Sequence, residues 1–328
     1  MSDHFIEDKT TKVTVNLEGT AEKVDFNDLK SGGFIKQRQK DLFTVRLRCP
    51  GGRLSTDKLI KIAEIANKYS KQGVVHFSFR QSLEILYVDY KEFNAVVAEL
   101  AKIGQKVASC GPRVRVPTAC GGCEYNPNGL TDTQGMAKMV DEKFFGTPTP
   151  HKFKTSFSGC PIDCARTKEM DFGFQGIVEP VWSEPECTGC TICSEACKED
   201  AIQSDPDTGK PIFDPNKCIY CGDCIRACPT EAWKAKRYGH IVRIGGKHGR
   251  HPMESVEVCK FLPDEKVPEA IHKTIEWYNA NGKRGERIGN AIKRVGLKKY
   301  LDYMEPVFES GSPVDYVGPA QGVHVAKG

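Results

Sequence analysis

Hydrophobic and polar positions change their period several times between residues 33 and 105. Short runs rich in β-branched and aromatic residues, the first of which alternates apolar and polar residues, predict strands. Two longer runs repeat their apolar residues every three or four positions, as one face of a helix does. The predicted strands cover residues 42–48, 74–79 and 83–88, and the predicted helices run through 59–66 and from 89 or 90 to 103. This order predicts an α+β unit of the split β-α-β kind.

Outside residues 33–105 the sequence predicts fewer helices and strands. An alternating run at 12–17 predicts a strand inside a polar N-terminal extension, and residues 238–246 predict a strand that returns to the main domain. Residues 129–145, with Met136 and Met139 on the core face, and residues 267–303 predict helices,. The predicted parts are an extension (1–31), a half-domain (32–105), a second domain (106–180 with 237–328) and an inserted module (181–236).

The composition is that of an ordinary globular protein, with 39% hydrophobic and 27% charged residues in 328,. No apolar run approaches the roughly 18 residues of a membrane-spanning helix, and the first residues do not resemble a secretory signal. We therefore expect a soluble, cytoplasmic protein. A net charge of +4 is too small to indicate binding to nucleic acid.

Cysteine is the unusual residue, with 15 copies. Disulfides are disfavoured in the cytoplasm, and twelve of the cysteines fall in close groups with the spacing of metal ligands,. The other three, Cys49, Cys110 and Cys259, stand alone. We interpret each of these as a small buried hydrophobic residue.

The densest cysteine groups form an internal duplication in the inserted module. Each repeat has the spacing Cys-x2-Cys-x2-Cys-x3-Cys of a two-cluster bacterial ferredoxin, in which the fourth cysteine of each repeat binds the other cluster. One predicted [4Fe-4S] cluster is bound by Cys187, Cys190, Cys193 and Cys228, and the other by Cys218, Cys221, Cys224 and Cys197. Zinc is the alternative, but eight cysteines at this duplicated spacing favour iron–sulfur clusters.

Four further cysteines precede the module in two close pairs. The pairs are Cys120 with Cys123 and Cys160 with Cys164. The segment between the pairs is long enough to fold back, so that four thiolates can bind one more [4Fe-4S] cluster. Lys152 and Lys154 precede the second pair and place positive charge beside it, which suits an anionic substrate or cofactor.

Arg48 and Arg80 both stand at the ends of predicted strands. Two interpretations remain open. The two side chains are either solvated separately or point into a shared cleft at the edge of the sheet.

Six short motifs follow one another along the chain. They are RLRCPGG at 46–52, FRQ at 79–81, GPRVR at 111–115, KFK at 152–154, SGCPIDCA at 158–165 and DFGFQG at 171–176. Together they resemble the siroheme-dependent sulfite and nitrite reductases, over roughly residues 32 to 250. The module after the second cysteine pair makes the chain most similar to the catalytic subunit of anaerobic sulfite reductases and to dissimilatory sulfite reductase subunits.

The resemblance implies an α+β fold with three parts. These are a ferredoxin-like sulfite reductase half-domain at 32–105, a siroheme and [4Fe-4S] α/β domain at 106–180 and 237–328, and the inserted two-cluster ferredoxin module at 181–236. It also implies that the thiolate of Cys164 bridges the first [4Fe-4S] cluster to the iron of siroheme.

The resemblance further assigns roles to six cations. By motif position, Arg48, Arg80, Lys152 and Lys154 bind the substrate anion and supply protons, and Arg113 and Arg115 bind siroheme carboxylates. The physical logic holds independently. Fixed cations stabilise the oxyanions that develop as oxygen leaves sulfite, arginine suits bidentate contact with an oxyanion, and lysine can relay protons.

The first cysteine pair departs from the family pattern. The family spacing Cys-x5-Cys would place the second thiolate at position 126, which is Asn126 here. Either Cys123 is the ligand, in a rebuilt loop that Gly121 and Gly122 permit, or another group such as Cys110 completes the cluster. We prefer Cys123.

The expected activity is the six-electron reduction of sulfite to sulfide, with electrons delivered through the two ferredoxin-type clusters. Nitrite reduction to ammonia at the same site is a close alternative. A non-catalytic electron-transfer subunit with a degenerate siroheme site is a rival, and a siroheme protein that binds other small ligands ranks last.

The resemblance also predicts partners. Assimilatory relatives carry two half-domains in one chain and this chain carries one, so we expect a homo-oligomer or pairing with a paralogous subunit. No Rossmann fingerprint is visible, so an electron-donor protein, either a ferredoxin or a flavin or iron–sulfur subunit, is expected to supply electrons.

Overall fold

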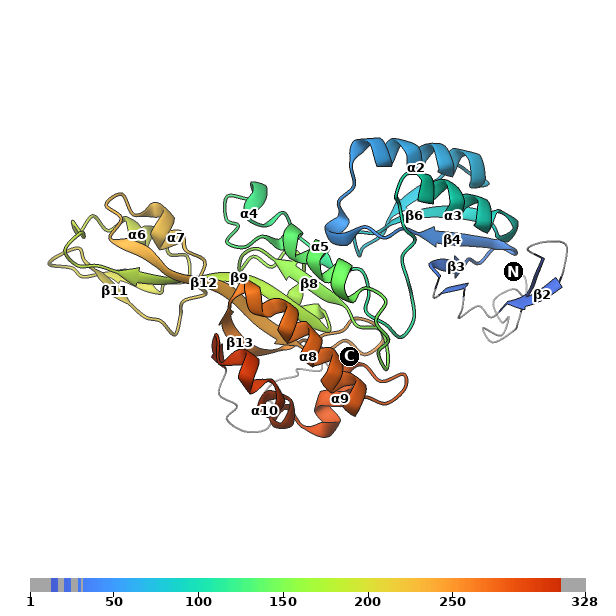
Figure 1. Ribbon diagram of the computed structural model, residues 1–328. Helices are drawn as coiled ribbons and strands as arrows, with labels where there is room; N and C mark the ends of the chain where they lie inside the picture. The colour runs from blue at the N-terminus through green and yellow to red at the C-terminus, as the bar shows by residue number, and fades with distance from the viewer. Residues whose placement is uncertain (1–12, 17–20, 25–28, 31, 314–328) are drawn as a thin grey trace. The chain divides into compact units, whose positions relative to one another are not determined.

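A computed structural model describes residues 13–16, 21–24, 29–30 and 32–313, and it divides the chain into two compact units (Figure 1). Unit 1 comprises Met1–Thr118 and Ala137–Lys154, and unit 2 comprises Ala119–Met136 and Thr155–Gly328. The strand predicted at 12–17 is β1 (Val13–Asn16), which pairs antiparallel with β2 (Ala21–Val24). The rest of the predicted extension, apart from residues 29–30, lies outside the described residues.

Unit 1 is built on an antiparallel four-stranded sheet in the order β3-β4-β6-β5. The strands are β3 (Phe34–Lys36), β4 (Leu42–Arg46), β5 (Val75–Phe77) and β6 (Leu83–Asp89). Two helices, α2 (Thr56–Tyr69) and α3 (Phe93–Lys102), lie on the sheet in Figure 1. The three predicted strands and both predicted helices are therefore confirmed, with shifted ends.

Local sequence and burial explain why these elements form. The hydroxyl of Ser55 caps α2 by accepting a hydrogen bond from the amide of Lys58 at 3.3 Å,. Ile62 of α2, Val96 of α3 and Ile85 of β6 are fully buried and belong to one core. Burial of one apolar face of each helix against the sheet is the main stabilising contribution.

Unit 2 is organised by a six-stranded sheet in the order β14-β13-β12-β9-β8-β7. The strands are β7 (Thr118–Ala119, at the boundary with unit 1), β8 (Thr155–Ser158), β9 (Phe172–Trp182), β12 (Trp233–Ile244), β13 (Val256–Leu262) and β14 (Ser312–Pro313). β8 and β9 are parallel and almost wholly buried. Strand β13 was not predicted from the sequence.

The helices of unit 2 differ from the predicted ones in their ends. The helix predicted at 129–145 is α5 (Thr133–Phe144), which crosses the boundary between the units. The helix predicted at 267–303 is three helices, α8 (Val267–Asn281), α9 (Ile288–Val295) and α10 (Leu297–Phe308). Gly285 and Gly296, with φ of 82° and 108°, separate them because a right-handed helix cannot continue through such residues,.

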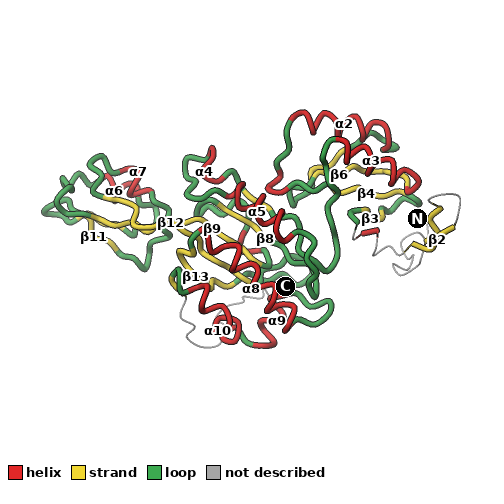
Figure 2. The backbone as a smooth tube through the Cα atoms, in the orientation of Figure 1, coloured by secondary structure: helices red, strands yellow, loops and turns green. Residues whose placement is uncertain are grey.

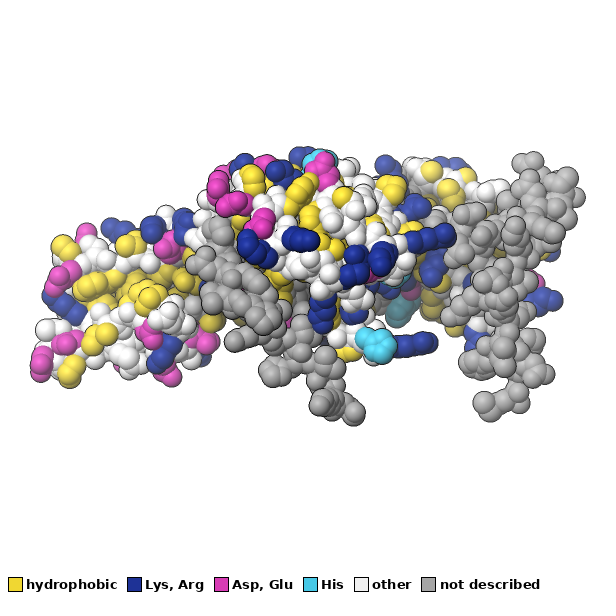
Figure 3. Space-filling view, turned by 90° about the horizontal axis from the view of Figure 1, so that it is seen from below, with side chains coloured by type: hydrophobic (Ala, Val, Ile, Leu, Met, Phe, Trp, Pro, Cys, Tyr) yellow, Lys and Arg dark blue, Asp and Glu magenta, His cyan; other side chains and the backbone are white. Residues whose placement is uncertain are grey.

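The cysteine-rich module lies between β9 and β12. These strands form a long antiparallel ladder whose outer end is the pair Trp182 and Trp233. The module holds two short helices, α6 (Ile192–Ala196) and α7 (Asp223–Ala227), and a hairpin of β10 (Ile202–Ser204) and β11 (Pro211–Phe213), joined by long loops (Figure 2). Its small core contains Cys193, Cys224 and Trp233. Hydrophobic side chains also reach its surface (Figure 3).

Candidate functional site

The backbone of unit 2 gathers the two cysteine pairs that precede the module. Cys120 follows β7, Cys123 lies in α4 (Gly122–Tyr125), and Cys160 and Cys164 lie in the turns after β8. The amides of Gly122 and Gly159 donate hydrogen bonds to the sulfur of Cys120, at 3.4 and 3.1 Å. The amide of Cys123 donates to the carbonyl of Thr131 at 3.0 Å. The loops of both pairs therefore meet.

The four thiols differ in exposure. Cys160 is buried, Cys120 is half-buried, and Cys123 and Cys164 are exposed. Burial raises the pKa of Cys160, the amide of Ile162 lowers it, and Cys120 and Cys164 raise it further. Three thiols are thus close enough to affect one another, which is the condition for sharing one cluster.

The eight cysteines of the module line two pockets, four in each. The inner pocket lies beside Pro180 of β9 and the outer pocket beside Trp233, and their empty volumes, open solvent included, are about 350 and 300 Å³. The inner pocket contains Cys197, Cys218, Cys221 and Cys224, and the outer pocket contains Cys187, Cys190, Cys193 and Cys228. These are the two crossed sets that the duplicated spacing predicts.

The local environments of these thiols differ. Burial raises the pKa of Cys221 to about 11 and that of Cys224 to about 12, so a metal that bound these two thiols would have to displace their protons. Burial also acts to raise the pKa of Cys228, but hydrogen bonds from the backbone of Trp233 and Thr230 outweigh it and lower the pKa. Backbone donors of this kind stabilise cluster sulfurs and tune their potential.

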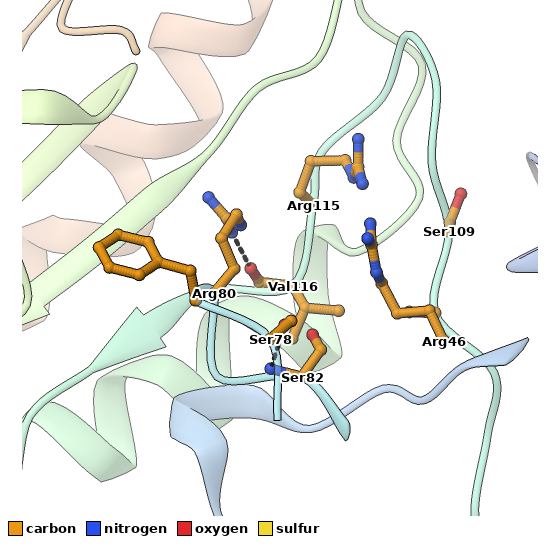
Figure 4. A pocket seen from close by; sticks show the side chains of 9 residues that line it. Arg46, Ser78, Arg80, Ser82, Ser109, Arg115 and Val116 are labelled. Carbon is orange, nitrogen blue, oxygen red and sulfur yellow. Dashed lines mark hydrogen bonds between the residues drawn. The ribbon is translucent and has the colours of Figure 1, made fainter. Parts of the chain in front are cut away.

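Unit 1 contains a pocket whose empty volume, open solvent included, is about 530 Å³ and whose lining includes three arginines, Arg46, Arg80 and Arg115 (Figure 4). Arg46, at the end of β4, donates to Glu84 at 2.6 Å and to the sulfur of Cys110 at 3.0 Å. Arg115 donates to the same sulfur at 2.9 Å, and Arg80 donates to the carbonyl of Val116 at 2.6 Å. Burial, together with its arginine neighbours, lowers the pKa of Arg115, although the Cys110 thiol opposes the shift.

Arg48 does not line this pocket. Its Nε donates to Oδ2 of Asp141 at 2.7 Å, and its terminal nitrogen donates to the carbonyl of Asp141 at 2.8 Å. The guanidinium also lies 4.0 Å from the centre of the Phe145 ring. Of the two arginines that were considered for a shared cleft, the pocket of unit 1 contains only Arg80.

The other predicted cations lie on two neighbouring extended segments of unit 1. Val114 and Phe153 form a parallel bridge and are both fully buried. In extended backbone, the residues directly before and after a given residue point to the face opposite to its own. Register therefore places four cations, Arg113, Arg115, Lys152 and Lys154, on one face. Nε of Arg113 is buried without a hydrogen-bond partner.

Sequence reasoning missed Arg46 and the role of Cys110. All three isolated cysteines are buried, as predicted. The Cys110 thiol, however, accepts two guanidinium donors and is not simply a hydrophobic residue. Alternation would place Arg46 and Arg48, two residues apart, on one face of a strand, but only Arg46 lines the pocket, so the spacing alone does not identify it.

Two features are absent from the described residues. No three His, Cys, Asp or Glu side chains among them converge on the position of a single metal ion. No helix in this part of the chain is long and apolar enough to cross a membrane.

Two family models match the chain. The nitrite/sulfite reductase ferredoxin-like half domain matches residues 35–103, and the nitrite and sulphite reductase 4Fe-4S domain matches residues 110–310. The solved structures of dissimilatory sulfite reductase I and of the Mycobacterium tuberculosis NirA protein superpose with TM-scores of 0.68 and 0.63. Their identities are 20% and 18%, and they cover 87% and 92% of this chain and 73% and 50% of their own. At such identities they show a shared fold.

Two known proteins are also similar to this chain in amino-acid sequence. The coenzyme F420-dependent sulfite reductase of Methanocaldococcus jannaschii is 32% identical over 88% of this chain, but the chain spans only 46% of that protein. One of the subunits of the anaerobic sulfite reductase of Salmonella typhimurium is 30% identical over 71% of this chain and 73% of its own length. Since one family model alone covers residues 110–310, the chain belongs to the nitrite and sulphite reductase family.

Proposed function

We propose that this protein reduces sulfite to sulfide at a siroheme coupled to a [4Fe-4S] cluster, with electrons delivered through two ferredoxin-type [4Fe-4S] clusters. One observation carries the proposal: eight cysteines line two pockets in two crossed sets of four, in the same unit as Cys120, Cys160 and Cys164. The names of the relatives support sulfite as the substrate.

The coupled cluster is assigned to the two cysteine pairs. Cys120, Cys123, Cys160 and Cys164 would hold it. Cys164 is exposed, which suits a thiolate that must also reach an external group. Asn126, at the usual ligand position, instead accepts a hydrogen bond from the amide of Asn128 at 3.0 Å. Cys110 belongs to unit 1 and its thiol already binds two guanidinium groups, so we assign the fourth ligand to Cys123.

The cations of unit 1 fit an anionic macrocycle. Siroheme carries carboxylates, and the buried, unpaired Nε of Arg113 is a donor that a carboxylate would satisfy,. Arg115, in the pocket beside it, would bind a second carboxylate,. When bound, siroheme would supply the iron centre at which sulfite is reduced.

The reaction consumes protons as well as electrons: SO₃²⁻ + 6 e⁻ + 7 H⁺ gives HS⁻ + 3 H₂O. Each oxygen leaves as water, so negative charge on oxygen must be stabilised and protonated. We assign stabilisation to Arg48 and Arg80, and proton delivery to Lys152 and Lys154. Asp141 acts as a positioning residue, because its two hydrogen bonds orient the Arg48 guanidinium.

The protein is proposed to work with partners. Relatives are named as subunits, and we infer a homo-oligomer or a pair with a paralogous subunit. An electron-donor protein is required because the sequence carries no Rossmann fingerprint for a nicotinamide cofactor. Nitrite is a second candidate substrate, since the matched family model covers both oxyanions.

The test is an anaerobic absorption spectrum of protein from cells that make siroheme, recorded before and after sulfite is added to the reduced sample. Siroheme bands that shift with sulfite are expected, together with about 12 non-haem irons per chain for three [4Fe-4S] clusters. Comparison of kcat/KM for sulfite and nitrite then selects the substrate. An iron–sulfur spectrum without extractable tetrapyrrole would overturn the enzyme and leave an electron carrier.

A further inference from the structure

The two pockets of the module are not equivalent in position, because the inner pocket borders the coupled-cluster site. The amide of Val178 on β9 donates to the carbonyl of Tyr220 at 3.0 Å. A Cβ added to Gly222 would lie 2.8 Å from Cγ1 of Val178 and 3.8 Å from Cδ2 of Leu130. The amide of Leu130 in turn donates to the carbonyl of Gly159, next to Cys160. The inner pocket therefore meets the loops that hold Cys120, Cys123 and Cys160.

The outer pocket lies at the other end of the module. Its lining includes Trp233, at the outer end of the β9–β12 ladder, and Gly209 in the loop after β10. Its ligand Cys190 is exposed. Because electron transfer slows steeply with distance, clusters that filled the two pockets would carry electrons from the outer pocket through the inner one to the coupled cluster.

The surface around the outer pocket is acidic and partly apolar. Between residues 183 and 232 the chain has ten Asp and Glu against four Lys and Arg, although the whole chain is +4. Glu186, Asp207 and Glu231 are exposed. Glu186 and Glu231 adjoin lining residues in sequence, and Asp207 lies two positions before the lining residue Gly209. Lys210, also nearby, is paired with Glu184 at 2.7 Å. Ile192 and Ile212, 39% and 57% exposed, are apolar positions on the same rim, and Figure 3 shows hydrophobic surface on this module with both acidic and basic side chains around it.

We propose that this outer rim, formed by residues 184–192, 205–212 and 228–231, is the docking surface for an electron-carrier protein whose redox group is ringed by basic residues. The proposal rests on the proposed function, because it assumes that clusters fill the pockets. Acidic charge steers a basic partner and sets its orientation. The exposed isoleucines supply the apolar centre that transient interfaces require.

A zero-length carbodiimide cross-link locates the surface directly. Horse cytochrome c, a basic carrier with an exposed haem edge, serves as the probe, because carbodiimide joins its lysines to carboxylates of the docked holoprotein. Mass spectrometry is expected to find the links in the peptides that contain Glu184 and Glu186, Asp207, or Glu231. Links spread over the chain, or concentrated on α10 at Asp302 and Glu305, would overturn the proposal.

A charge-reversal pair gives the kinetic test. Asp207→Lys is expected to slow electron transfer from reduced holoprotein to cytochrome c about tenfold at low ionic strength, and less at high salt. Glu305→Lys on α10 makes the same change in net charge at another exposed position and is expected to change the rate less than twofold. Equal effects of the two variants, or faster transfer to an acidic plant-type ferredoxin than to cytochrome c, would refute docking at the rim.

The outcome is separable from that of the proposed function. Reduced methyl viologen is a small dye that needs no protein docking. Dye-driven sulfite reduction by the unaltered protein therefore tests the enzyme, while the cross-link positions test the surface.

Discussion

The ion pair between Arg48 and Asp141 is a test of how unit 1 is held together. The two side chains are 17% and 6% exposed, and the guanidinium makes two hydrogen bonds to Asp141, at 2.7 and 2.8 Å. The Phe145 ring also packs against the Arg48 guanidinium. Removal of the arginine alone leaves a buried carboxylate without its charge partner, which costs about 3–5 kcal/mol.

Arg48→Met is therefore expected to weaken hydrogen-exchange protection in β4 and in residues 137–154. Since 1.4 kcal/mol corresponds to a factor of ten, exchange should accelerate by about 10²- to 10³-fold. The loss of stability caused by Arg48→Met should grow as pH rises. Burial already raises the pKa of Asp141, and Arg48 opposes this. Without Arg48, the pKa of Asp141 in the folded chain lies above its pKa in the unfolded chain, which is about 3.9. The free energy of unfolding therefore falls as pH rises from the unfolded pKa to the folded one.

The double variant Arg48→Met/Asp141→Leu is the decisive comparison. Two apolar side chains should restore protection to within about 1 kcal/mol of the natural protein. Lys61→Met, which breaks an exposed pair with Glu64, is the control and should change exchange less than twofold,. A double variant as poorly protected as the sum of its single changes would refute the reasoning. If Arg48 also contacts sulfite, the stable double variant remains slow in sulfite reduction.

Four further substitutions test other positions. Gly222→Ala introduces a Cβ at a residue with φ of 78°, 2.8 Å from a neighbouring side chain. The change should destabilise the module by about 1–2 kcal/mol. The measurement is the temperature at which iron is released, which should fall. Cys123→Ser should remove about four irons per chain and Cys110→Ser none, by iron analysis. The hydrogen bond from His240 lowers the pKa of Asp264 in the folded chain. The stability that the ionised Asp264 contributes is therefore fully present above its unfolded pKa of about 3.9 and is lost as pH falls through its folded pKa. Asp264→Asn should flatten the acid side of a plot of the thermal unfolding midpoint against pH.

Most of the fold of unit 1 could be predicted because its signals are local. The apolar repeat at 59–66 and the alternation at 42–48 each describe a half-buried element, and α2 and β4 form there. The pattern failed where the chain changes direction without a break in composition. Residues 267–303 stay helical in composition, yet Gly285 and Gly296 take positive φ and divide the segment. Strand β13 was missed because its buried residues do not alternate strictly.

The same contrast separates the cysteines from the arginines. The partners of the module's cysteines follow from spacing alone, since a duplicated motif leaves few ways to assemble two sets of four, and the pockets hold the expected sets. Arginine partners depend on contacts that spacing does not encode: Asp141 is 93 positions from Arg48, and Cys110 is 64 from Arg46. A motif therefore predicts which residue type stands at a position, whereas only the folded chain shows what its charge meets: Arg46 pairs with Glu84 and lines a pocket, and Arg48 pairs with Asp141 outside that pocket.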